Sequence, residues 1–162
     1  MKSSVSTFLL CAALAGCAST AGEGRIAADY VVDAADEAAV LAAMESYIDG
    51  FYEGEPAHLE RALSPDLVKL GFRRSAPDEP FGEPMPMTYA EALALAAQIG
   101  EGDAAPRDQS ATKVEILELA DKMAAGKITA FWGIDYVHLV KEDGAWRIRH
   151  VIWQSEPALA GD

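Results

Sequence analysis

The chain has 162 residues, enough for one domain with a sizeable hydrophobic core. Acidic residues outnumber basic residues by 26 to 13, which gives a formal net charge of −13 at pH 7. Such a field repels phosphate backbones, so nucleic acid is not expected as a partner. The sequence has no metalloprotease or paired-cysteine spacing, no phosphate-binding glycine loop and no nucleophile elbow, so neither a metal nor a cofactor is expected.

The N-terminus predicts export. Lys2 supplies a basic start, and the apolar run from Val5 to Ala15 is too short to span a bilayer as a helix. The segment ending in Cys17, Leu-Ala-Gly-Cys, resembles the lipobox of bacterial lipoproteins, in which the cysteine is acylated after cleavage. Ala18 stands where inner-membrane retention signals have aspartate, so the resemblance implies an anchor on the periplasmic side of the outer membrane. An ordinary secretory signal with a chance cysteine is the alternative.

The rest of the chain predicts one folded domain on a short tether. The expected organisation is a signal peptide at residues 1–16, a tether at 17–32, one domain at 33–156 and a tail at 157–162. Membrane contact is expected only through the acyl chains, which anchor a protein without spanning the bilayer.

Three helices are expected in the first part of the domain. Apolar residues recur at helical spacing from an acid-capped start near Asp33 or Asp36 to about Gly54, and a short helix is expected over Pro56 to Leu63. A third helix follows the capping box Thr88-x-x-Glu91 and ends near Ile99.

The segment between the second and third expected helices is harder to assign. Ser64 followed by Pro65 is typical of an N-cap with proline at the first helical position. Asp66 to Phe72 is therefore expected as a short helix or as a turn into a strand.

The last part of the domain predicts strands. Val114 to Ala120 is expected to be a strand, and its imperfect alternation indicates either a bulge or a strand covered on both sides. Asp143-Gly144 lies between two apolar runs, Phe131 to Val140 and Trp146 to Gln154, which predicts a hairpin with a type I′ turn. Helices followed by strands give an α+β fold: a cone-shaped, curved antiparallel sheet with three N-terminal helices packed on its concave face.

The turn fixes an expected register for this hairpin. One face then carries Trp146, Ile148, His150 and Ile152 with Leu139, Val137, Asp135 and Gly133. This face is apolar near the turn and is taken as the core side. Its two polar members, Asp135 and His150, are diagonal neighbours roughly 7–8 Å apart. The opposite face, with Tyr136, His138 and Trp153, is expected to be half-solvated or to form a subunit interface. A slip of one residue would exchange the two faces.

The C-terminal segments carry a family resemblance. Gly133 to Lys141, Asp143 to Ile148 and Ile152 to Gln154 resemble the putative lumazine-binding family. That family belongs to the nuclear-transport-factor-2-like superfamily, which also contains ketosteroid isomerases and SnoaL-like polyketide cyclases. The resemblance covers about Asp33 to Ser155 and implies the cystatin-like fold of that superfamily. Many members have His-Pro-Asp where this chain has Ser-Pro-Asp at residues 64–66, so any role of that histidine is absent.

Three functions stay open at this stage. The first is a non-catalytic domain that binds a small, largely apolar ligand between Tyr47, Asp135, His150 and Ile152, and forms a homodimer through the sheet face of Tyr136, His138 and Trp153. The second is a cofactor-free isomerase, dehydratase or cyclase that uses Asp135, His150 and Tyr47 in acid–base chemistry. The third is an envelope interaction module with a filled interior. Plain core packing of Tyr47 and a structural Asp135–His150 hydrogen bond are the alternatives at the site itself.

The three tryptophans could stack on a planar ligand, but Trp146 is expected in the core, and Trp132 is expected to seal the dimer face together with Trp153.

Overall fold

The computed structural model describes residues 31–76, 78–102, 109 and 111–156. The expected signal peptide, the lipidation site Cys17, the tail and most of the tether lie outside these residues. The elements in chain order are α1 (Ala34–Asp49), the π-helical turn η1 (Gly50–Gly54), α2 (Pro56–Ala62), β1 (Leu63–Phe72), β2 (Met85–Met87), α3 (Tyr89–Gly100), β3 (Lys113–Leu119), β4 (Met123–Ala130), β5 (Gly133–Glu142) and β6 (Ala145–Gln154). No helix in the described ranges is long and apolar enough to cross a membrane.

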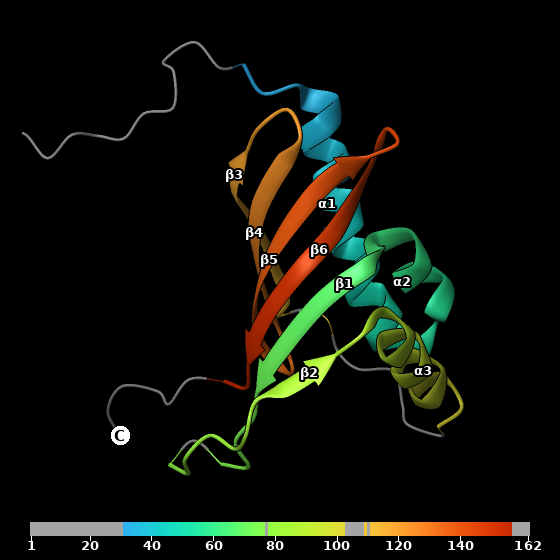
Figure 1. Ribbon diagram of the computed structural model, residues 1–162. Coiled ribbons are helices and arrows are strands. Elements are labelled where there is room, and N and C mark those ends of the chain that lie inside the picture. The colour runs from blue at the N-terminus through green and yellow to red at the C-terminus, as the bar shows by residue number, and fades with distance from the viewer. Residues whose placement is uncertain (1–30, 77, 103–108, 110, 157–162) are drawn as a thin grey trace, which may run out of the picture. The chain divides into compact units, whose positions relative to one another are not determined.

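The six strands form one curved sheet that does not close on itself (Figure 1). Their order is β2-β1-β6-β5-β4-β3, and the three helices lie on one face of the sheet. The expected α+β fold, with three N-terminal helices covering a curved sheet, is confirmed. One pairing differs from the expectation: β1 and β6 run parallel, whereas the other neighbours are antiparallel. The chain returns to β1 only with its last strand, and this long connection allows the parallel arrangement.

Local signals account for the helices. The Asp33 side chain accepts a hydrogen bond from the first turn of α1, and α1 buries a stripe that includes Met44 and Tyr47. The expected first helix does extend to Gly54, but its last turn is π-helical. Both hydrogen bonds of the predicted capping box at Thr88 are present at the start of α3.

The hairpin turn also forms as predicted. Asp143 and Gly144 have φ values of 49° and 82°, as a type I′ turn requires. The four cross-strand pairs next to the turn, as far as Leu139 with Ile148, match the expected register.

Beyond these four pairs a β-bulge changes the register of β6. An uninterrupted ladder would place Arg149 opposite His138, but the structure pairs His138 with His150. The extra residue turns the rest of β6 over, so that Val151 is buried while His150 and Ile152 are exposed on the outer face. The prediction that His150 and Ile152 line a pocket on the core side is therefore wrong.

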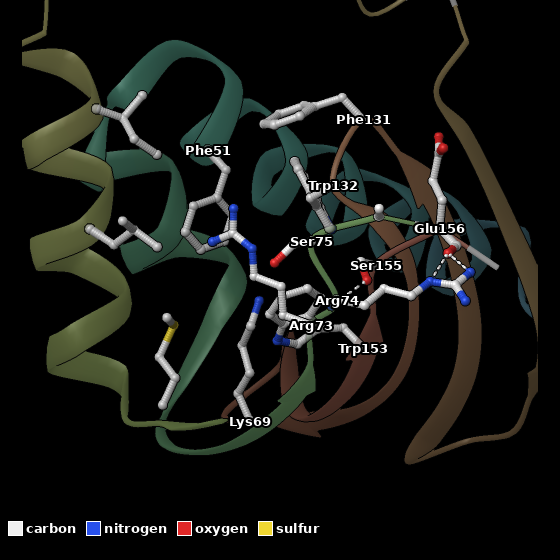
Figure 2. Close-up of a pocket in the computed structure, with 14 residues that line it drawn as sticks. Phe51, Lys69, Arg73, Arg74, Ser75, Phe131, Trp132, Trp153, Ser155 and Glu156 are labelled. Atoms are coloured by element: carbon white, nitrogen blue, oxygen red, sulfur yellow. Dashed lines mark hydrogen bonds between the residues drawn. The ribbon is translucent and has the colours of Figure 1, made fainter. Parts of the chain in front are cut away.

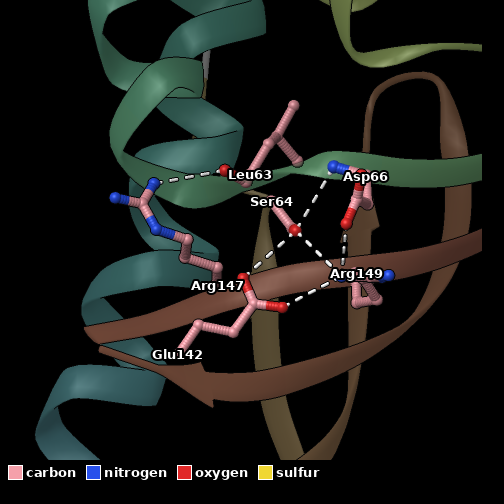
Figure 3. A network of polar contacts seen from close by, with 6 residues as sticks. All are labelled: Leu63, Ser64, Asp66, Glu142, Arg147 and Arg149. Atoms are coloured by element: carbon pink, nitrogen blue, oxygen red, sulfur yellow. Dashed lines mark hydrogen bonds and ion pairs between the residues drawn. The ribbon is translucent and has the colours of Figure 1, made fainter. Parts of the chain in front are cut away.

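A polar network occupies the region of the bulge (Figure 3). One guanidinium nitrogen of Arg149 lies 3.0 Å from Oε1 of Glu142 and 3.1 Å from Oδ2 of Asp66. The hydroxyl of Ser64 donates a hydrogen bond to Oε2 of Glu142 at 3.2 Å. Ser64 and Pro65 lie inside β1, so the predicted helix start at these residues is wrong. The regular pairing of β1 with β6 is also interrupted here. Through its hydrogen bond to Glu142, Ser64 supports the strand pairing in this chain.

Candidate functional site

A cavity of about 570 Å³ lies beside α3 and the strands β1 and β6 (Figure 2). This volume lies within the range of about 300–1,000 Å³ that is typical of small-molecule sites. Most of its wall is apolar or aromatic, from Phe51, Ala76, Met87, Leu95, Ile99, Phe131, Trp132 and Trp153. The remaining lining is polar and includes three basic side chains.

Lys69 lies in the wall of this cavity although its side chain is largely buried. It alternates along β1 with buried Leu67, so its side chain points to the core face, and the whole residue is only 7% exposed. Its Nζ donates a hydrogen bond to the hydroxyl of Tyr47. Nζ also lies 5.0 Å from the ring centroids of Tyr47 and Phe51 and 5.8 Å from that of Trp153. Cation–π contacts with three rings therefore help to stabilise a buried ammonium group.

Asp135 comes from the adjacent part of the core face, the face expected from the hairpin register, and is fully buried. The indole nitrogen of Trp132 donates a hydrogen bond to its Oδ2 at 3.0 Å. Its Oδ1 lacks a hydrogen-bond partner within the described part of the chain. The expected Asp135–His150 pair does not form, because the bulge places His150 on the other face of the sheet. Neither Tyr47 nor Asp135 lines the cavity. Tyr47 is hydrogen-bonded to Lys69, and Asp135 to Trp132, and these two partners do line it.

The three buried polar groups shift one another's pKa values. Burial lowers the pKa of Lys69, and the charge of Asp135 opposes this effect. Burial raises the pKa of Asp135, whereas the charge of Lys69 and the hydrogen bonds from Trp132 and Tyr47 partly lower it. Burial, followed by the charge of Asp135, raises the pKa of Tyr47 well above its ordinary value, so its hydroxyl keeps its proton at neutral pH.

Trp132 reaches the site from the turn between β4 and β5. Tyr52 supports this turn, because its hydroxyl accepts a hydrogen bond from the backbone nitrogen of Phe131 at 3.4 Å. The Tyr52 ring also packs 5.1 Å from the ring of Phe131 and 5.7 Å from that of Trp132. The indole of Trp132 lines the cavity and orients Asp135, and its place at a dimer face stays a prediction.

Trp153 lies on the cavity side because of the bulge in β6. It pairs opposite Asp135, and its ring lines the cavity, so its predicted place on the outer face of the sheet is wrong. Gly71 of β1 leaves room for this ring: a Cβ at Gly71 would lie 2.1 Å from the indole nitrogen. The other two expected interface residues, Tyr136 and His138, do lie exposed on the outer face.

The mouth of the cavity is basic. Arg73 is exposed and extends into the cavity, and no hydrogen bond or ion pair joins its guanidinium to another residue of the described ranges (Figure 2). Arg74 is fixed differently: its Nε donates to the backbone oxygen of Glu156 at 3.1 Å, and its backbone nitrogen donates to the hydroxyl of Ser155 at 3.0 Å. The local charge is therefore opposite in sign to the net charge of the chain.

Sequence reasoning missed Lys69 and Arg73. A signal for Lys69 was present, because it stands at every second position with Leu67 and Gly71 in an otherwise apolar run. Arg73 lies in a connection whose path the sequence does not define. The described residues contain no group of three or more His, Cys, Asp or Glu side chains that could hold a metal ion.

Residues 35–154 match the model of a family described as putative lumazine-binding. Curated proteins gave no match.

Solved structures of the same fold are distant in sequence. A nuclear-transport-factor-2-like protein of unknown function from Silicibacter pomeroyi has a TM-score of 0.60 at 16% identity, covering 78% of this chain and 100% of that chain. One from Shewanella baltica has a TM-score of 0.58 at 15% identity, covering 78% and 98%. A putative scytalone dehydratase from Novosphingobium aromaticivorans has a TM-score of 0.52 at 13% identity, covering 79% and 96%. Similarity at this level of identity shows the fold and does not transfer an activity.

Proposed function

We propose that this chain, which belongs to the putative lumazine-binding family, binds a small and largely apolar ligand in the cavity beside Lys69. The observation that carries the proposal is the open cavity of about 570 Å³, walled mainly by aromatic and aliphatic side chains, with a buried lysine in its wall. Ligand sites combine these features: apolar walls supply most of the contact area, and a few polar groups fix the orientation.

The aromatic walls favour a ligand with a flat ring. Phe51 and Trp132 meet edge to face, with ring centroids 5.8 Å apart, and Trp153 lies across the same space (Figure 2). Rings held at fixed angles can offer both faces and edges to a planar guest. The open cavity also argues against an interaction module whose interior is filled by its own side chains.

A titration with a neutral aromatic probe tests the proposal. 2-Naphthamide should shift the amide resonances of α3 and of the β4–β5 turn in a ¹⁵N-labelled sample and leave those of the outer sheet face in place. Leu95→Trp would add a large side chain to the cavity wall and should weaken binding at least about tenfold. Leu117→Trp is the matched control, since Leu117 is an exposed leucine outside the cavity. Uniform small shifts, or equal affinity in the two variants, would refute the proposal.

Catalysis is the second candidate, and one observation favours it. Asp135 and Tyr47 are buried, have raised pKa values and are coupled to the lysine in the cavity wall. Perturbed groups of this kind cluster at catalytic sites. His150 takes no part in this version, because it lies on the opposite face of the sheet.

Deuterium exchange distinguishes the enzyme from the simple binding protein. An acid–base enzyme should accelerate exchange of the α-protons of 2-tetralone in D₂O, followed by proton NMR, through Lys69, which lines the cavity. Asp135→Asn should change the pH dependence of this acceleration, because the charge of Asp135 raises the pKa of Lys69. A binding protein should bind 2-tetralone without changing its exchange rate.

Location and assembly are further parts of the proposal. The N-terminal pattern supports export and acylation of Cys17, with anchoring at the periplasmic side of the outer membrane. Radiolabelled palmitate should be incorporated into the full chain and not into its Cys17→Ser variant. A homodimer through the outer sheet face, which includes Tyr136 and His138, is supported by the 54% exposure of Tyr136. Sedimentation should show a dimer that Tyr136→Glu dissociates; a monomeric parent protein would end this part of the proposal.

A further inference from the structure

We propose that the ligand is an aromatic acid whose single anionic group, a carboxylate or its equivalent, is bound by Lys69 and Arg73. This inference rests on the proposed ligand-binding function and adds the charge of the ligand. The net charge of −13 gives no hint of it, since an acidic chain would be expected to favour cations.

Lys69 has N–H donors that are available to a ligand. An ammonium group has three N–H donors, and the structure records one hydrogen bond, to the hydroxyl of Tyr47. Lys69 forms no ion pair within the described part of the chain, although it is only 7% exposed and borders the cavity. Burying donors without partners is unfavourable, and a carboxylate in the cavity would offer two acceptor oxygens to them.

Arg73 is the second cation that is available to a ligand. Its guanidinium points into the same cavity from the mouth and has no partner among the described residues (Figure 2). Arginine donates several N–H groups in a planar fork that matches a carboxylate. The acidic side chain in the described lining, Glu156, lies beside Arg74 in Figure 2, on the side of the cavity away from Phe51.

The charge count points to one negative charge on the ligand. The buried carboxylate of Asp135 already offsets one of the two cations, through its charge on Lys69. Arg74 lies beside Glu156 in the same lining, and these two side chains carry opposite charges, so Lys69 and Arg73 with the buried Asp135 leave a single positive charge for the ligand to neutralise. The rings of Phe51 and Trp153, whose centroids lie 5.0 Å and 5.8 Å from Nζ of Lys69, match an aromatic body attached directly to the acidic group.

A matched pair of probes tests this inference. 2-Naphthoate and 2-naphthamide have the same ring system and differ mainly in charge, and both can be titrated by calorimetry at pH 7. The parent protein should bind the acid at least about tenfold more tightly than the amide. Lys69→Met should remove most of this preference, and Arg73→Gln should reduce it several-fold. Lys127→Met is the control, because Lys127 pairs with Glu115 away from the cavity and should leave the preference unchanged.

The outcomes separate this inference from the proposed function. Equal affinity for acid and amide overturns the inference and leaves ligand binding intact, whereas no binding of either probe overturns both. If Lys69→Met does not fold, the parent protein decides through its pH dependence. Burial lowers the pKa of Lys69 below 10.5, so the preference for the acid should shrink as the pH rises towards that value. A preference that stays constant over this interval contradicts a role for Lys69.

Discussion

Replacing Lys69 by methionine should strongly destabilise the fold. Methionine keeps the length and apolar stem of the side chain and removes the charge that partly offsets the buried Asp135 carboxylate. Removing one partner of a buried charged pair typically costs about 3–5 kcal/mol. Asp135 can take up a proton instead, and its pKa is already raised, so we expect about 3 kcal/mol at pH 7. This is a large share of the roughly 5–15 kcal/mol that stabilises a domain.

The double variant identifies the cause of that loss. If the uncompensated carboxylate is the problem, adding Asp135→Asn to Lys69→Met should recover about 1–2 kcal/mol, within the usual coupling of neighbouring residues. Lys127→Met is the control for losing a lysine from the sheet. Lys127 and Glu115 lie 3.6 Å apart with partly exposed side chains, and ion pairs at the surface contribute only about 0–1 kcal/mol.

Urea denaturation followed by tryptophan fluorescence measures both effects. The three tryptophans, Trp132, Trp146 and Trp153, are all at least partly buried, so unfolding should change their emission. With a denaturant slope of about 1–3 kcal/mol/M, a loss of 3 kcal/mol lowers the midpoint by about 1–3 M. The reasoning is refuted if Lys69→Met costs no more than Lys127→Met, or if the double variant shows the sum of the two single losses.

Three further changes have defined outcomes. Gly71→Ala places a Cβ 2.1 Å from the Trp153 indole, so it should cost about 1–3 kcal/mol in urea and weaken 2-naphthamide binding. The hydrogen bond from Lys141 lowers the pKa of Asp36 in the fold, so Asp36→Asn should lower the melting temperature at pH 7. This difference in melting temperature should vanish as the pH falls below 3.8 through the lowered pKa, because the carboxylate is then protonated in the parent protein as well. Thr88→Ala removes the side-chain cap of α3 and should cost about 1 kcal/mol in the same urea assay.

Matched controls accompany these three changes. Gly82→Ala introduces a Cβ whose nearest contact is 3.5 Å away, so it should leave both stability and binding nearly unchanged. Thr88→Ser keeps the capping oxygen and should retain most of the stability. For Asp36, a melting-temperature deficit that is the same at pH 7 and at about pH 2.5 would contradict the linkage argument.

The parts of the fold that were predictable from the sequence depend on local signals. The capping box at Thr88 and the Asp143-Gly144 turn each involve a few consecutive residues, and both form as expected. The helical stripe of α1 is likewise encoded by spacing alone. These features gave the correct α+β fold with three helices on one face of the sheet.

The register of the last strand was not predictable from the same kind of signal. The bulge at Arg149 coincides with contacts to Asp66, more than eighty residues earlier in the chain, and to Glu142. A one-residue bulge exchanges the two faces of a strand, so it moved His150 out of the expected site and Trp153 into it.

Two of the four residues predicted for the site, His150 and Ile152, lie on the outer face of the sheet. Tyr47 and Asp135 were expected on the core face and are found there, because they precede the bulge or belong to another element. Lys69 was missed because its burial depends on β1 lying beside β6 and on the aromatic rings that this pairing gathers around it.

The most direct test of this account is the pKa of Lys69, measured from its side-chain ammonium resonance in a ¹⁵N-lysine sample. The account predicts a pKa below the usual 10.5, lower still in Asp135→Asn, and higher when 2-naphthoate is added, since a bound anion favours the charged form. A Lys69 resonance that titrates with the exposed lysines, and that neither Asp135→Asn nor 2-naphthoate shifts, would contradict the account.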